Sequence, residues 1–187
     1  MRKIVLASQS PRRKQLLEWA EIPFEVLVRP TDELFPPTLS LEEVPVYIAN
    51  NKALAVQSEV EEGTIILAAD TIVVLNDHVL GKPVHREDAV SMLLALSGST
   101  HRVITGVVLK KGEEEIHFQD ITEVEFHSLT VGDIEYYVDN YQPYDKAGGY
   151  AIQEWIGVTG IKSIKGDFYN VMGLPVSRVI KALQELD

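Results

Sequence analysis

Residues 3–20 read KIVLASQSPRRKQLLEWA, and this stretch points to the type of fold. Residues 3–7 form a short run that is rich in β-branched side chains, which favours a strand. Ser10 then supplies a helix-capping hydroxyl, and Pro11 suits the first helical position, where a backbone N–H has no partner within the helix. The stretch therefore predicts a strand, a tight turn and a helix.

The rest of the chain alternates between the two kinds of element. Strands are expected over residues 24–28, 64–75, 79–80, 101–111 and 114–126. Helices are expected over residues 40–60, 86–96 and 133–141 and from residue 175 onward. The glycine-rich stretch 143–173 predicts loops and short strands. Because helices interleave with strands and hairpins occur as well, we expect an α/β fold with a mixed sheet.

The composition excludes several classes of protein. With 187 residues, 45% of them hydrophobic and 24% charged, the chain matches an ordinary globular protein, and we expect one domain over residues 1–187. No cysteine occurs, which rules out disulfides, thiolate metal sites and cysteine nucleophiles. The formal net charge of −11 argues against nucleic acid or an anionic membrane as a partner.

No targeting segment is apparent either. The basic start resembles that of a signal peptide, but its apolar run ends after about four residues, too short for a signal. The longest apolar stretch, residues 64–75, is interrupted by Asp70 and is shorter than the roughly 20 residues of a membrane span. We therefore expect a cytoplasmic protein with no membrane partner.

Positive charge is concentrated at the beginning of the chain. Residues 1–14 carry five lysine and arginine side chains and no acid. Arg12 and Arg13 fall in the first turn of the predicted helix, where their charge opposes the helix dipole. An anion bound at the free N–H groups of the helix start would explain them. The alternative is a solvated basic helix start.

Asp70 lies within the predicted strand 64–75, between aliphatic side chains. A buried carboxylate costs several kcal/mol unless it is paired, metal-bound or open to a cleft. Such a group can ligate a divalent cation or act as a general base. The alternative is an acid at a turn or strand end, hydrogen-bonded to backbone.

Two lysines stand beside glycine-containing turns, Lys82 in residues 81–83 and Lys146 in residues 145–150. Glycine lets backbone approach a ligand closely, and a lysine ammonium suits phosphate oxygens. Each lysine alone could equally be part of a solvated turn. The sequence has no phosphate loop, dinucleotide-binding fingerprint, serine-nucleophile elbow or paired zinc histidines.

Together, an anion-binding helix start, dispersed lysines and a buried aspartate describe a site for a polyphosphate with a hard divalent ion. The residues that carry this pattern, in chain order, resemble the Maf family of nucleoside triphosphate pyrophosphatases. They are Leu6-Ala-Ser-Gln-Ser-Pro-Arg-Arg13, Ala69-Asp-Thr71, Gly81-Lys-Pro83, Ser97-Gly98 with His101, Val103 and Thr105-Gly106, Asp145-Lys-Ala-Gly-Gly-Tyr-Ala-Ile-Gln153, and Gly173-Leu-Pro175.

The resemblance implies a mixed, twisted sheet in two lobes with helices packed around it and an active-site cleft between the lobes, related to the inosine triphosphate pyrophosphatases. It implies hydrolysis of a nucleoside triphosphate between the α and β phosphates, with a divalent cation such as Mg²⁺, Mn²⁺ or Co²⁺. The subgroup resembled acts on dTTP and UTP, and modified pyrimidine nucleotides are further candidate substrates. A homodimer is the family expectation.

The resemblance also implies roles for individual residues. Asp70 matches the catalytic proton acceptor, and Arg12, Thr71 and Gln153 match positions associated with substrate choice. Positions that hold phosphate or metal in the family correspond to Ser8, Ser10, Arg13, Lys52, Lys82 and Glu33. We expect Lys146 to bind phosphate, and Asp70 and Glu33 to bind the metal.

Two positions depart from the family pattern. Gln142 stands where Glu is common before proline, and Glu154 stands where glycine commonly follows the Ile-Gln pair. These changes concern the fine positioning of the loop around Gln153. A different class of function stays open: a nucleotide-binding regulator of cell division and septum formation that uses the same pocket without turnover.

Overall fold

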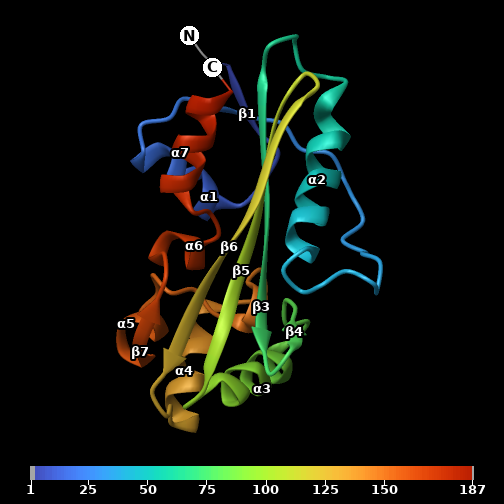
Figure 1. The fold of residues 1–187 in the computed structure, drawn as a ribbon. Helices are drawn as coiled ribbons and strands as arrows, with labels where there is room; N and C mark the ends of the chain where they lie inside the picture. The colour runs from blue at the N-terminus through green and yellow to red at the C-terminus, as the bar shows by residue number, and fades with distance from the viewer. Residues whose placement is uncertain (1–2, 187) are drawn as a thin grey trace. The chain divides into compact units, whose positions relative to one another are not determined.

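The computed structural model describes residues 3–186, and in this part of the chain seven strands form one sheet (Figure 1). Its order is β2-β1-β3-β5-β6-β7, with β4 paired to β3. The strands are β1 (Ile4–Leu6), β2 (Glu25–Val26), β3 (Ile65–Leu75), β4 (His78–Leu80), β5 (Thr100–Lys111), β6 (Glu114–Phe126) and β7 (Ile161–Lys165). β1 pairs in parallel with β2 and β3, whereas β4 and β7 pair antiparallel with β3 and β6. The predicted mixed α/β fold is confirmed.

Helices connect these strands. They are α1 (Pro11–Trp19), α2 (Val44–Gln57), α3 (Arg86–Leu96), α4 (Val131–Tyr141), the 3₁₀ turn η1 (Ala147–Gly149), α5 (Trp155–Gly160), α6 (Phe168–Met172) and α7 (Val176–Glu185). The predicted helix over 86–96 and strand over 114–126 have the observed bounds. Within residues 3–186, no helix is long and apolar enough to cross a membrane.

The chain divides into two compact units. Unit 1 comprises residues 1–70, 105–120 and 173–187, and unit 2 comprises residues 71–104 and 121–172. Strands β3, β5 and β6 contribute residues to both units. The single domain expected over residues 1–187 stays a prediction, as does the predicted position of the active site.

Unit 1 has a core on each face of its strands. On one face, the small side chains Ala49 and Ala53 of α2 pack against Ile66 and Ala68 of β3. Successive side chains of a strand point to opposite faces, so Ile65 and its alternate neighbours point to the other face, on which α1 and α7 lie (Figure 1). This two-sided burial explains why β3 is nearly continuously apolar.

Unit 2 is built around a separate cluster, in which Val73, Val103 and Val124 are buried together. Helices α3 and α4 pack against each other, and α3 also contacts η1. The hairpin between β3 and β4 turns at Asn76 and Asp77, both with positive φ.

The prediction of loops and short strands over 143–173 was wrong in part. The segment contains β7 but also the short helices α5 and α6. The predicted helix over 40–60 is shorter as well. Glu43 accepts hydrogen bonds from the Ser40 backbone N and hydroxyl, 2.8 and 2.7 Å away, in a turn that precedes the helix rather than capping it. The helix itself begins at Val44, with Pro45 in its first turn.

Candidate functional site

Asp70 occupies the middle of β3, with buried residues on both sides of it in the strand. Its side chain is 13% exposed, and its Oδ1 accepts a hydrogen bond of 2.6 Å from Lys52 Nζ. Lys52 belongs to α2, whose small core residues allow the helix to lie close to β3. The carboxylate is therefore paired within a strand, and the alternative of an acid at a turn or strand end is wrong.

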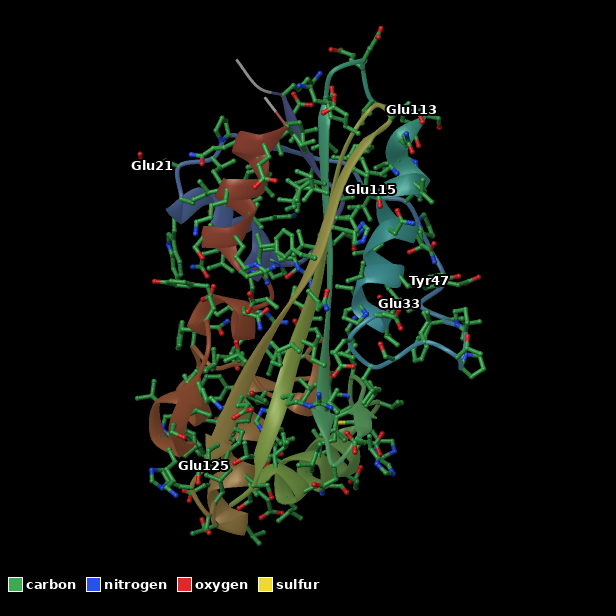
Figure 2. All side chains as sticks on the ribbon, viewed as in Figure 1. Glu21, Glu33, Tyr47, Glu113, Glu115 and Glu125 are labelled. Atoms are coloured by element: carbon green, nitrogen blue, oxygen red, sulfur yellow. The ribbon has the colours of Figure 1, made fainter. Side chains whose placement is uncertain are left out.

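A second carboxylate reaches the same ammonium group. Glu33 Oε1 lies 3.1 Å from Lys52 Nζ, and the Glu33 side chain is 55% exposed (Figure 2 labels it beside α2). Lys52, predicted to bind phosphate, thus lies between the two residues predicted to bind metal. One cation faces two anions, so the trio has a net negative charge if all three are ionised.

The start of α1 is organised by two serines. Ser10 caps the helix by accepting a 3.4 Å hydrogen bond from the Arg13 backbone N. The buried Ser8 hydroxyl accepts from the Ser10 backbone N at 3.2 Å and from Arg13 Nη1 at 3.1 Å. Arg13 Nε donates to the Gly173 carbonyl at 2.8 Å. The guanidinium of Arg13 is therefore buried and bonded to two parts of unit 1, so the alternative of a solvated helix start is wrong for it.

The surroundings of Arg13 link the predicted charged residues of unit 1. Burial lowers the pKa of Arg13 to about 10, while the negative charges of Asp70 and Glu33 act to raise it and the positive charge of Arg12 acts to lower it. A pKa of about 10 leaves Arg13 charged at neutral pH. The charged groups of α1, the 30–42 loop and β3 thus lie close enough to act on one another.

Arg12 differs from its neighbour. It is half-buried, and its Nε is buried without a hydrogen-bond partner within residues 3–186. An unsatisfied buried donor costs about 1–3 kcal/mol. The first turn of α1 has no acidic residue to accept from it. A bound anion, which the arginines at this helix start led us to expect, would supply the missing acceptor.

Asp70 and Glu33 are the two residues predicted to bind a metal ion. Within residues 3–186, no group of three His, Asp or Glu side chains could hold one, so a cage made only of protein is absent there. Two carboxylates that converge on one ammonium do fit a hard divalent cation that takes its other ligands from phosphate oxygens and water. Asp70 and Glu33 therefore suit a metal that arrives with a nucleotide.

Unit 2 contains the other predicted site residues. Thr71 follows Asp70 directly on β3 and is half-buried, whereas Lys82 and Gln153 are exposed. The Gly148 backbone N donates to the Gly81 carbonyl at 3.0 Å, which joins the turn of Lys82 to the segment that contains Lys146.

Gly148 itself is required by this packing. Its φ is 72°, a conformation that favours glycine, and a Cβ there would lie 3.0 Å from the Val73 side chain. This contact fixes the 145–150 segment against β3.

The contacts of three further residues were not predicted from the sequence. The Gly173 carbonyl accepts from Arg13, and Tyr137 and Glu154 bind the segment around Gln153. Gly173 belongs to one of the family motifs, but the motif does not show that its carbonyl accepts from Arg13, and no sequence signal marks the core Tyr137. Glu154 did carry a signal, because it departs from the family pattern, but the pattern does not show what it contacts.

Comparison with known proteins gives extensive matches. The family described as Maf-like protein matches residues 3–186. A dTTP/UTP pyrophosphatase of Cytophaga hutchinsonii is 51% identical over 183 residues, covering 98% of this chain and 84% of that protein. A dTTP/UTP pyrophosphatase of Bacteroides fragilis is 49% identical over 185 residues, covering 98% and 96%, and one of Porphyromonas gingivalis is 46% identical over 186 residues, covering 98% and 94%.

Among solved structures, the chain is similar to the Ham1 protein of Staphylococcus aureus, with 16% identity, a TM-score of 0.47, and coverage of 67% of this chain and 72% of that one. The fold of this chain is defined by the strand pairing and helices described above.

Proposed function

Because the chain belongs to the Maf family, we propose that it is a nucleoside triphosphate pyrophosphatase that hydrolyses dTTP and UTP to the monophosphate and pyrophosphate. The substrates named for its relatives of about half-identical sequence support this choice. The single observation in the structure that supports it best is the ion-paired Asp70 of β3 close to the buried charge of Arg13. Modified pyrimidine nucleotides are further candidate substrates.

Asp70 is the proposed general base. Its Oδ1 is held by Lys52, while its Oδ2 makes no hydrogen bond within residues 3–186. Oδ2 can therefore accept a proton from a water molecule as that water attacks the α phosphorus. Lys52 fixes the direction of the carboxylate, because a side chain held by a short ion pair loses rotational freedom.

The start of α1 is the proposed phosphate site. The positive end of its helix dipole, the hydroxyls of Ser8 and Ser10 and the charges of Arg12 and Arg13 stabilise the negative charge that builds up on the leaving pyrophosphate. A divalent cation (Mg²⁺, Mn²⁺ or Co²⁺), when bound to Asp70 and Glu33, would neutralise further phosphate charge. Lys52 and Lys82 are the other proposed phosphate-binding residues, and Arg12, Thr71 and Gln153 are proposed to select the base. A homodimer in the cytoplasm stays a prediction from the sequence.

The substitution Asp70→Asn tests the general base. Asparagine keeps the shape and can still contact Lys52, but its amide cannot take up a proton. We expect kcat for dTTP to fall by about 10³-fold or more, with dTTP still bound, measured by pyrophosphate release and by calorimetry. A variant that retains a tenth of the activity would remove Asp70 from this role.

Asp77→Asn is a matched control, because Asp77 is an exposed acid at the β3–β4 turn that pairs with Arg102. It should leave kcat within about twofold. Product analysis of the unsubstituted protein tests the reaction itself: monophosphate and pyrophosphate are expected, whereas nucleoside diphosphate and free phosphate would contradict it. Binding of dTTP without any product would favour the regulator instead.

A further inference from the structure

Gln153 lies in the loop between η1 and α5, and its exposed side chain makes no hydrogen bond within residues 3–186. Its position is therefore set by its neighbours in the chain. Ile152 on one side is buried, and Glu154 on the other is half-buried. Both neighbours, and Ala151 before them, are held by specific contacts.

Tyr137 of α4 makes two of these contacts with its hydroxyl. The side chain is completely buried and stacks on Tyr141 at a ring separation of 5.0 Å. Its hydroxyl donates to Glu154 Oε2 and accepts from the Ala151 backbone N at 3.1 Å. One oxygen atom of a rigid helix therefore binds the chain on both sides of Gln153.

Glu154 carries the connection to the beginning of the segment. Its Oε1 lies 3.5 Å from Lys146 Nζ, and Lys146 also donates to Asp145 Oδ1 at 2.7 Å. The Lys146 side chain is only 11% exposed. Its charge is thus balanced by two carboxylates, which makes it a weaker attractant for phosphate than a solvated, unpaired lysine.

The backbone around Gln153 is fixed as well. The Glu154 backbone N donates to the Ala151 carbonyl at 3.1 Å, and the Glu154 carbonyl accepts from Gly157 N at 2.9 Å. A Cβ on Gly157 would lie 1.8 Å from the Ile152 carbonyl oxygen. Only glycine therefore allows α5 to lie so close to the backbone of Ile152. The peptide units next to Gln153 have little freedom to move.

We propose that Tyr137, Glu154 and Lys146 form a positioning network that sets the direction of Gln153 and, through it, the choice of nucleotide base. Lys146 then acts within this network instead of binding phosphate. The inference rests on the proposed function for the role of Gln153. In this proposal the three network residues act only through Gln153, so their substitution should change selectivity and leave the bond-breaking step largely intact.

Tyr137→Phe and Glu154→Gln test the network. Phenylalanine removes only the hydroxyl, and glutamine keeps the size of the side chain but not its charge. The measurement is the ratio of dissociation constants for non-hydrolysable α,β-methylene analogues of dTTP and dCTP, by calorimetry with Mg²⁺. We expect this ratio to fall about tenfold in each variant. The kcat for dTTP should stay within about twofold of the original value. Glu125→Gln, which breaks the exposed pair with Lys162, is the matched control and should change neither quantity.

Lys146→Met separates positioning from phosphate binding. Inorganic tripolyphosphate has no base, so its inhibition constant reports on phosphate contacts alone. We expect that constant to stay within about twofold while the base ratio falls. Unchanged base ratios in the first two variants, equal affinity of the original protein for the two analogues, or a tenfold weaker inhibition constant in Lys146→Met would each overturn the proposal. Because analogue binding needs no turnover, absence of pyrophosphate release would count against the proposed function and leave this test standing.

Discussion

At the level of single residues, Arg12 and Arg13 are adjacent in sequence but have different surroundings. Arg13 is buried and bonded to Ser8 and Gly173, whereas Arg12 has a buried Nε without a partner within residues 3–186. The first arrangement supports the fold of unit 1. The second leaves a donor available for a ligand.

We expect Arg13→Ala to lower the free energy of unfolding by about 2–4 kcal/mol, because two buried acceptors lose their donor. Arg12→Ala should change that free energy by less than about 0.5 kcal/mol while raising KM for dTTP about tenfold. Urea denaturation without nucleotide measures the free energy of unfolding, and steady-state kinetics measure KM for dTTP. Equal losses of stability in the two variants would contradict the division of roles.

His101 is a second buried residue with a measurable consequence. Its Nε2 lies 2.6 Å from the Tyr150 hydroxyl, its ring stacks on Phe126, and burial lowers its pKa from 6.5 to about 4. Since the folded pKa is below the unfolded one, the unfolded chain binds more protons as pH falls below 6.5. The stability that the neutral ring provides above pH 6.5 is therefore lost progressively down to about pH 4.

His101→Gln keeps a hydrogen-bonding group for Tyr150 but does not titrate. We expect the stability advantage of the original protein over this variant to shrink by about 2 kcal/mol between pH 7 and pH 5. Urea denaturation at the two pH values measures it, with His78→Gln at the exposed β3–β4 turn as the control. A constant advantage would show that the folded and unfolded states bind the same number of protons at His101 in this range, so that burial does not lower its pKa.

At the level of elements, the position of α2 depends on Gly106 of β5. A Cβ there would lie 2.2 Å from the backbone N of Val46, so any side chain forces α2 away from the sheet. We expect Gly106→Ala to cost about 3 kcal/mol of unfolding free energy, and to lower kcat because Lys52 moves away from Asp70. Gly132→Ala is the control, because its nearest neighbour would be 3.8 Å away. An unaltered stability for Gly106→Ala would mean that the helix can shift freely.

The sequence predicted an element well where its side chains repeat with the period of that element. α3 buries Ala89, Leu93 and Leu96 on one face, and its bounds were predicted correctly. α5 has six residues and two glycines, so it offers no such repeat. Its glycine at 157 is explained only by the contact with Ile152, which no local pattern contains.

In the candidate site, too, some features could be predicted from the sequence and others could not. Residue types and motif order indicated Asp70, the arginines and the lysines, because their chemistry is unusual for their surroundings. Their partners could not be predicted, since the Lys52–Asp70 pair and the Arg13–Gly173 bond join segments far apart in the chain. Glu154 is an example. The sequence indicated that this residue is unusual, but only the packing of α4 against α5 shows which groups it binds.

At the level of the whole molecule, charge distribution separates a small anion from a long one. The chain has a formal net charge of −11, yet five of its 17 lysine and arginine residues fall in the first 14 positions. A nucleoside triphosphate needs only this local concentration of cations, while a polynucleotide also meets the acidic remainder of the surface and is repelled. We expect inorganic tripolyphosphate to inhibit dTTP hydrolysis competitively at millimolar concentration and an oligothymidylate of 20 nucleotides to have no effect at the same phosphate concentration. The assay is pyrophosphate release at about 50 mM salt, where attraction between charges is strongest. Inhibition by the oligonucleotide would mean that the positive charge extends well beyond the start of α1, and would reopen nucleic acid as a partner.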